Sequence, residues 1–200
     1  MNRTTLYGLL SGHTAAAIWG GMYVVSKVVM EVIPPFSLIT LRLILGILTL
    51  GIILAIRGGL KLTARQFWQV FGVGFVGYGI SIGFQFVGTK LSTAANGSLV
   101  TSATPAFVLL FAALLLREKI TLRRLLALIV ASLGVLAVID LRTAQLSPDL
   151  FLGNIYLVAA ALTWALYSVL IRVATRSMGV LSTSLSAFAG GLPVSVPLGA

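Results

Sequence analysis

Few side chains in this 200-residue sequence are suited to covalent or metal-based chemistry. There is no cysteine and only one histidine, His13, which excludes a disulfide framework, a cysteine nucleophile and a His-rich metal cluster. The sequence also lacks a GxxxxGK[ST] phosphate-binding loop, so ATP does not drive this chain directly. We therefore expect no cofactor and no metal. The acidic residues are too scattered for an EF-hand loop or a catalytic carboxylate pair: Glu31, Glu118, Asp140 and Asp149.

A second group of side chains suits the binding of a solute rather than its conversion. Trp19 and Trp164 lie in the middle of long apolar runs, whereas tryptophan in membrane proteins usually lies at the interface, as expected for Trp68. These two side chains either offer flat walls and indole donors to a solute or fill space between helices. Tyr78 and Gln85, seven residues apart, would share a helical face and could line the same cavity. Further candidates for its wall are Tyr23, Asn96, Thr101 and Tyr167.

Two basic residues, Lys27 and Arg42, fall well inside apolar runs. A cation at membrane depth is a functional candidate because it is costly to place there, and either residue could pair with a substrate carboxylate. Arg42 follows Pro35 by seven residues, about 10 Å along a helix, and could instead bond carbonyls of neighbouring helices. Lys27 could simply extend to the interface. His13 could relay protons, the alternative being a packed, hydrogen-bonded histidine.

Pro105 lies at the midpoint of a fourth apolar run and predicts a helix kink, because its nitrogen cannot donate to the carbonyl of Thr101. The polar residues before it could form one wall of a cavity; the alternative is a structural kink satisfied by a threonine hydroxyl. These residues are Asn96, Ser98, Thr101, Ser102 and Thr104.

The third run is rich in glycine, and the first contains Gly8-x-x-x-Gly12. Small residues at such spacings predict close packing of helices, with helix sliding as a secondary role. The glycines of the third run are Gly72, Gly74, Gly77, Gly79, Gly83 and Gly88.

All these side chains must be positioned by membrane-spanning helices. The chain is 58% hydrophobic and only 9% charged, with a mean hydropathy of +1.09, which leaves too little polar surface for a soluble domain. A bilayer core about 30 Å thick requires roughly 20 helical residues. The sequence thus predicts an all-α integral membrane protein with about seven spans: 7–30, 35–56, 67–89, 94–116, 120–139, 153–171 and 181–200.

The basic residues between these runs predict the orientation. If the N-terminus is cytoplasmic, ten of them fall on the cytoplasmic side and only Lys90 and Arg142 on the other, with Glu31, Asp140 and Asp149. This is a strong positive-inside bias, and it explains the net charge of +10 without a nucleic-acid partner. The ten residues are Arg3, Arg57, Lys61, Arg65, Arg117, Lys119, Arg123, Arg124, Arg172 and Arg176.

An internal repeat is visible at an offset of 145 residues, which aligns Gly8 with Gly153 and Trp19 with Trp164. Coincidence among small apolar residues is the alternative explanation. A first copy at 1–145 would hold five spans, so a second copy from 152 would enter the membrane with opposite topology, as in many secondary transporters. A complete second copy would reach about residue 290 by this offset, so we expect 152–200 to be its truncated start and the chain to be a piece of a ten-span protein.

Several short motifs support this architecture: Trp19-Gly20, Lys27, Pro34-Pro35, Leu41-Arg42, Ser92 to Asn96, Thr104 to Phe107, Leu116 to Lys119, and Gly134-Val135. Together they resemble the EamA domain of the drug/metabolite transporter superfamily. The resemblance implies a bundle of two inverted five-helix repeats (5+5) that moves metabolites such as amino acids, often outward, across a bacterial inner membrane. This sequence departs from the pattern by ending after the seventh run.

The leading hypothesis is thus a secondary transporter, permease or exporter, of small metabolites that works by alternating access and is not an enzyme. No acidic residue lies inside a run, so the usual carboxylate proton relay is missing from this sequence, and facilitated transport, exchange and coupling elsewhere all fit. A structural or sensory membrane subunit is the alternative. A membrane-embedded lipid enzyme fits less well, because no catalytic constellation is present.

Overall fold

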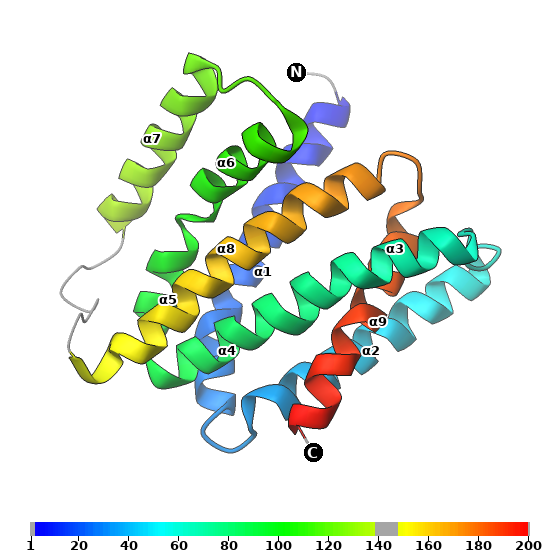
Figure 1. Ribbon diagram of the computed structural model, residues 1–200, viewed down its shortest axis with the longest axis horizontal. Helices are drawn as coiled ribbons and strands as arrows, with labels where there is room; N and C mark the ends of the chain where they lie inside the picture. The colour runs from blue at the N-terminus through cyan, green and yellow to red at the C-terminus, as the bar shows by residue number, and fades with distance from the viewer. Residues whose placement is uncertain (1–2, 139–147, 200) are drawn as a thin grey trace.

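The computed structural model describes residues 3–138 and 148–199, which form helices joined by short connections (Figure 1). This confirms the predicted all-α class. The helices are α1 (Arg3–Val29), α2 (Pro35–Ile56), α3 (Ala64–Gly74), the π-helix η1 (Phe75–Ser81), α4 (Ile82–Leu91), α5 (Ala94–Thr101), α6 (Thr104–Leu116), α7 (Leu122–Val138), the 3₁₀ turn η2 (Pro148–Leu150), α8 (Phe151–Ala174) and α9 (Val180–Gly199).

Each predicted apolar run falls in helix, and five helical segments in the described residues are long and apolar enough to cross a membrane. These are Pro35–Ile56, Ala64–Leu91, Ala94–Leu116, Phe151–Ala174 and Val180–Gly199. The first run forms α1, which has 27 residues but includes His13, Lys27 and several hydroxyl side chains that lower its hydropathy. The fifth forms α7, of which 17 residues are described. Asp140 and Arg142 lie outside the described residues.

Local sequence signals set the ends of α2 and α3. Pro35 begins α2, where a missing backbone N–H costs nothing. After α2, Gly58 and Gly59 adopt positive φ angles of 94° and 83°, a conformation that favours glycine. Thr63 and Gln66 then form a capping box: the Thr63 hydroxyl accepts from the Gln66 N–H, and the Gln66 side chain accepts from the Thr63 N–H. The chain therefore reverses direction sharply between these two helices.

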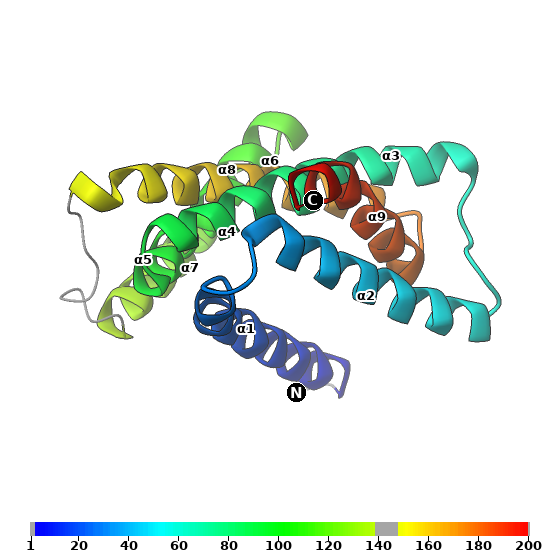
Figure 2. The ribbon, with the colours of Figure 1, turned by 90° about the horizontal axis from the view of Figure 1, so that it is seen from below.

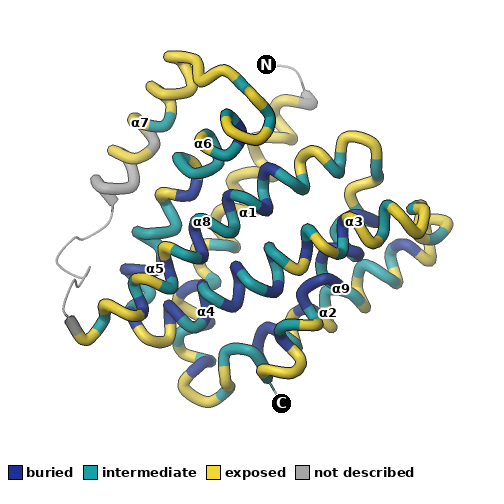
Figure 3. Tube along the Cα trace, in the orientation of Figure 1, coloured by how far each residue is buried: buried dark blue, intermediate teal, exposed yellow. Residues whose placement is uncertain are grey.

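The centre of the molecule is the long helix formed by α3, η1 and α4, which runs beside α8 in Figure 1. On its other side α9 packs against α2, α3 and η1. Helix α1 lies on one side of this assembly, where it contacts α4 and α5 (Figure 2). Helix α7 is exposed along nearly all of its described length (Figure 3). The well-packed part of the structure is therefore α2, α3–η1–α4, α8 and α9.

Glycines allow these helices to approach closely. A Cβ atom on Gly74 would collide with the backbone of Ala187 in α9, and one on Gly190 would collide with the carbonyl of Phe71 in α3. At the other end, a Cβ on Gly88 would lie 3.0 Å from the carbonyl oxygen of Gly153 in α8. The glycine-rich third run therefore packs as predicted. By contrast, a Cβ atom added to Gly8 or Gly12 would have no atom of another segment within 4 Å. This motif therefore allows no close helix contact within the described residues.

Lys27 connects α1 to the end of α4. Its ammonium group donates to the carbonyl oxygens of Thr89, Lys90 and Ser92 at 2.8, 2.9 and 2.7 Å. Three donors meet three carbonyls at the C-terminal end of a helix, where the helix dipole also favours a cation. Lys27 therefore holds two helices together instead of extending freely to the interface.

We predict that Lys27→Met lowers the free energy of unfolding by about 2 kcal/mol, because charged hydrogen bonds are lost and partly buried carbonyls lose their partners. Lys90→Met is the matched control, since the Lys90 side chain is exposed and only its carbonyl takes part. Thermal unfolding in detergent checks this. Equal unfolding temperatures for the two variants would contradict the role of Lys27 in joining α1 to α4.

A second prediction concerns the glycine contacts. Gly74→Ala should destabilise the protein by 1 to 3 kcal/mol or more, roughly the cost of overpacking, because the new methyl group meets backbone that cannot move aside. Gly72→Ala lies two residues earlier, where the added Cβ atom would have no neighbour within 4 Å, and should be neutral or slightly stabilising. Denaturation of both variants compares the two positions. The contact would be wrongly placed if both substitutions were tolerated equally.

Candidate functional site

A cavity of about 1040 Å³ opens between α1, α5, α6, α7 and α8. Its wall is mostly apolar, with polar groups at two levels. One level holds Tyr23, Thr101 and the two tryptophans, Trp19 and Trp164; the other holds charged side chains near the ends of α6 and α8. Mostly apolar pockets with a few convergent polar groups are typical of small-molecule sites.

The polar wall of the cavity is built where the fourth run is interrupted. Helix α5 ends at Thr101 and α6 begins at Thr104, so the helix is interrupted just before Pro105, which lies in the first turn after the break. Proline is favoured there because that turn needs no N–H donor. Thr104 and Pro105 both line the cavity, and the Thr104 hydroxyl is buried without a hydrogen-bond partner.

Tyr23 and Thr101 meet across the cavity wall. Their hydroxyl oxygens are 2.6 Å apart, which makes a short hydrogen bond between α1 and α5. Tyr23 is buried, so its apolar ring packs while its hydroxyl reaches the interrupted region of the fourth run. This hydrogen bond brings together two of the residues that were predicted to line the cavity, Tyr23 and Thr101.

The two central tryptophans are in contact. The rings of Trp19 and Trp164 have centroids 5.1 Å apart, and Trp164 also contacts Tyr167 at 4.8 Å and Tyr78 at 5.7 Å. Tyr78 lies in the π-helix η1 and packs edge-on against Phe188 of α9 at 4.5 Å. Aromatic rings from α1, η1, α8 and α9 thus form one continuous cluster, and the π-helix that contributes Tyr78 is an element often found at functional sites.

A smaller cavity of about 200 Å³ lies on the other side of Trp19. Its wall includes Arg42 and Tyr78 along with Phe86 and Phe188. The guanidinium carbon of Arg42 is 5.4 Å from the centroid of the Phe86 ring, a cation–π distance. Trp19 lines both cavities, so they adjoin at this residue.

Four of the predicted site residues line neither cavity: Lys27, Gln85, Asn96 and Tyr167. Asn96 belongs to a polar group between α5 and α8, in which its side-chain amide donates to Ser92 and to Asn154, each at 3.0 Å. Gln85 is buried but does not share the cavity-facing side of Tyr78. The π-helix turns through fewer degrees per residue than an α-helix, so a spacing of seven no longer returns to the same face. Tyr167 packs against Trp164 and Tyr78 instead of lining a cavity.

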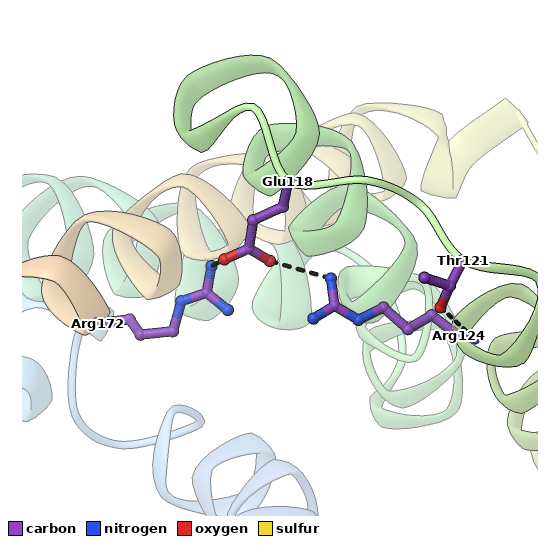
Figure 4. A network of polar contacts seen from close by, with 4 residues as sticks. All are labelled: Glu118, Thr121, Arg124 and Arg172. Atoms are coloured by element: carbon purple, nitrogen blue, oxygen red, sulfur yellow. Dashed lines mark hydrogen bonds and ion pairs between the residues drawn. The ribbon is translucent and has the colours of Figure 1, made fainter.

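The sequence did not predict an ion-paired group at the end of the larger cavity. Arg117 adopts a left-handed conformation that ends α6, and Glu118 follows it. The Glu118 carboxylate accepts from Arg124 of α7 at 3.0 Å and from Arg172 of α8 at 2.8 Å (Figure 4). All three charged side chains line the cavity. Glu118 lies in one of the motifs quoted above, but its partner Arg172 is 54 residues away, so only the tertiary structure reveals the pair.

Similar proteins are known by sequence. One, named an uncharacterized transporter, YetK, of Bacillus subtilis (strain 168), is 28% identical over 174 residues, which cover 85% of this chain and 53% of that protein. Another, an uncharacterized transporter of Archaeoglobus fulgidus, is 24% identical over 155 residues, which cover 76% of this chain and 53% of that protein. The chain thus spans about half the length of these curated relatives.

A solved crystal structure has the same fold, with a TM-score of 0.72 at 24% identity over 94% of this chain and 65% of the other. The sequence model of the EamA-like transporter family matches residues 6–139, which include α1 to α6 and the described part of α7. With its apolar helices arranged around a cavity and this match over most of its length, the chain belongs to the EamA-like transporter family and is a multi-pass membrane protein.

Proposed function

We propose that the protein is a secondary transporter that moves small metabolites, such as amino acids, across the bacterial inner membrane by alternating access. The observation that carries this proposal is the larger cavity, which brings Trp19, Tyr23, Thr101 and Trp164 together between apolar helices. Relatives named as transporters support the same general activity. We assign no enzymatic activity to the chain.

The proposed mechanism uses two inverted repeats, 1–145 and 152–200, with the substrate between them. Trp19 and Trp164 occupy equivalent positions at the offset of 145, and the contact between their rings supports a symmetry axis that passes between α1 and α8. In inverted-repeat transporters the solute binds near the membrane midplane where the repeats meet. Rocking of one repeat against the other would expose this site to each side in turn.

The contacts also support the proposed orientation, with a cytoplasmic N-terminus. Arg124 and Arg172, both assigned to the cytoplasmic side by charge, each pair with the same carboxylate, that of Glu118. Lys27, near the end of the first predicted span, contacts the end of α4, where Lys90 lies, and Lys90 is assigned to the outer side. The larger cavity would thus extend from the midplane tryptophans to the cytoplasmic ion pairs.

Transport provides the direct test. The protein, expressed from its complete reading frame and reconstituted in proteoliposomes, should exchange one class of labelled amino acids, nucleosides or sugars with saturable kinetics. Trp19→Ala should reduce this flux at least tenfold, roughly the effect of losing a central aromatic contact worth more than 1.4 kcal/mol. The control is Trp68→Ala, which removes an exposed ring far from both cavities and should leave the flux unchanged.

A flux that rises linearly with concentration and is equal in Trp19→Ala would contradict the proposal. Absence of flux from folded protein across the whole panel would favour a structural or sensory subunit.

The ion-paired group yields a separate prediction about stability. Glu118→Gln removes both pairs and should lower the free energy of unfolding by about 1 kcal/mol at low salt, a small value because all three side chains are partly exposed. In 1 M NaCl the difference from wild type should shrink, since screening already weakens the pairs. Lys119→Gln, which changes an exposed neighbour, is the control. A salt-independent difference would show that Glu118 acts by packing instead.

A further inference from the structure

The two basic side chains inside the apolar runs have different surroundings. All three donors of Lys27 meet carbonyl oxygens. Arg42 makes no hydrogen bond or ion pair with any residue in 3–138 or 148–199; its one recorded interaction is the cation–π contact with Phe86. A guanidinium stays charged in proteins and carries five N–H donors. Arg42 therefore brings a positive charge and unpaired donors to the membrane-spanning region.

The surroundings of Arg42 suit an anion with an apolar body. The smaller cavity places the guanidinium beside the rings of Trp19, Tyr78 and Phe188. No acidic residue lines this cavity within the described residues, and Glu118, which lines the larger one, is already shared by two arginines. The contact with Phe86 uses no N–H donor in a hydrogen bond to oxygen, so the donors of Arg42 remain for a ligand. Two of these donors, side by side on the guanidinium, match the two oxygens of a carboxylate.

The size of the cavity limits what can bind there. About 200 Å³ is less than a typical small-molecule pocket, so it holds only one end of a metabolite. Trp19 lines both this cavity and the larger one, whose wall includes Thr101 and Thr104. A solute with its charged end at Arg42 would extend past Trp19 into the larger cavity.

We propose that the smaller cavity is a carboxylate subsite: Arg42 binds the carboxylate of the substrate through two hydrogen bonds, and Trp19, Tyr78 and Phe188 receive the adjoining apolar group. This inference rests on the proposed transport function and narrows its substrate class to organic anions or zwitterions with a free carboxylate. Amines and neutral amides of the same size are excluded, because they give the guanidinium no negative partner.

The test compares ligands that differ only in this group. Intrinsic tryptophan fluorescence of the reconstituted protein is titrated with leucine and leucinamide, and with 3-phenylpropionate and 3-phenylpropionamide. The same compounds are then tested as competitors of flux. We expect at least one carboxylate to bind tenfold or more tightly than its amide.

Variants at Arg42 locate the effect. Arg42→Gln should raise the Kd of the carboxylate at least tenfold and bring it close to that of the amide. Arg42→Lys should recover part of the difference, because it restores the charge but not the two-pronged geometry. Arg57→Gln, which removes an exposed arginine at the end of the same helix, is the matched control and should bind as the wild type does.

Equal binding of carboxylates and amides by the wild-type protein would overturn the proposal, as would an unchanged Kd in folded Arg42→Gln. If Arg42→Gln fails to fold, the wild-type ligand pairs and Arg42→Lys decide the question. The two proposals fail differently. Saturable flux of a neutral or cationic solute that is unchanged in Arg42→Gln would support the transport function and contradict the carboxylate subsite. Carboxylate binding that depends on Arg42, without any flux, would support the subsite and contradict the transport function.

Discussion

The bilayer offers no water to hydrogen-bond with polar groups, and this constraint accounts for several of the contacts between helices in this protein. Lys27 meets three carbonyls at the end of α4, and the Ser81 hydroxyl donates to the carbonyl of Ala160 in α8 at 2.8 Å. The amide of Asn96 similarly bridges α5 to α8 through Asn154. Each of these bonds joins helices that are distant in sequence. The hydrogen bonds of these polar groups therefore depend on the packing of the helices. Glycines at the contacts allow the backbones to come close enough for such bonds to form.

Four buried hydroxyls in the described residues lack a hydrogen-bond partner, those of Thr40, Thr89, Thr104 and Ser195, and only Thr104 among them lines one of the two cavities. Thr104 keeps an unpaired buried hydroxyl in the larger cavity, and Arg42 lines the smaller one without a charged partner in the described part of the chain. Between them lie Trp19 and Trp164, large amphipathic rings placed at the centre of their helices. A binding site for a polar solute requires polar groups that are not already paired within the protein. The proposed substrate, which carries a carboxylate, follows from the Arg42 guanidinium that lacks a charged partner.

Much of this arrangement could be predicted from the sequence, because hydropathy and small-residue spacing are local signals. The all-α fold, the family and the packing role of the third run's glycines were all predicted, and the structure or the family match confirms them. What depends on tertiary contacts was not predictable. The π-helix Phe75–Ser81 has no local signature and displaces Gln85 from the face of Tyr78. The partners of Lys27 and Glu118 come from other helices, so their roles were visible only after folding.

The attachment of α1 has a mechanical consequence. Lys27 fixes the C-terminal end of this helix to α4, while residues 5–18 are exposed along its other half. A rod held at one end pivots about that end, and displacement grows in proportion to distance from it. Trp19 is eight residues from the tie, about 12 Å, and Tyr7 is twenty residues away, about 30 Å. Each degree of tilt thus moves Trp19 by about 0.2 Å and Tyr7 by about 0.5 Å, from the helical rise per residue. Trp19, which lines both cavities, lies close to this pivot, so a given tilt of α1 about Lys27 moves Trp19 much less than it moves the N-terminal half.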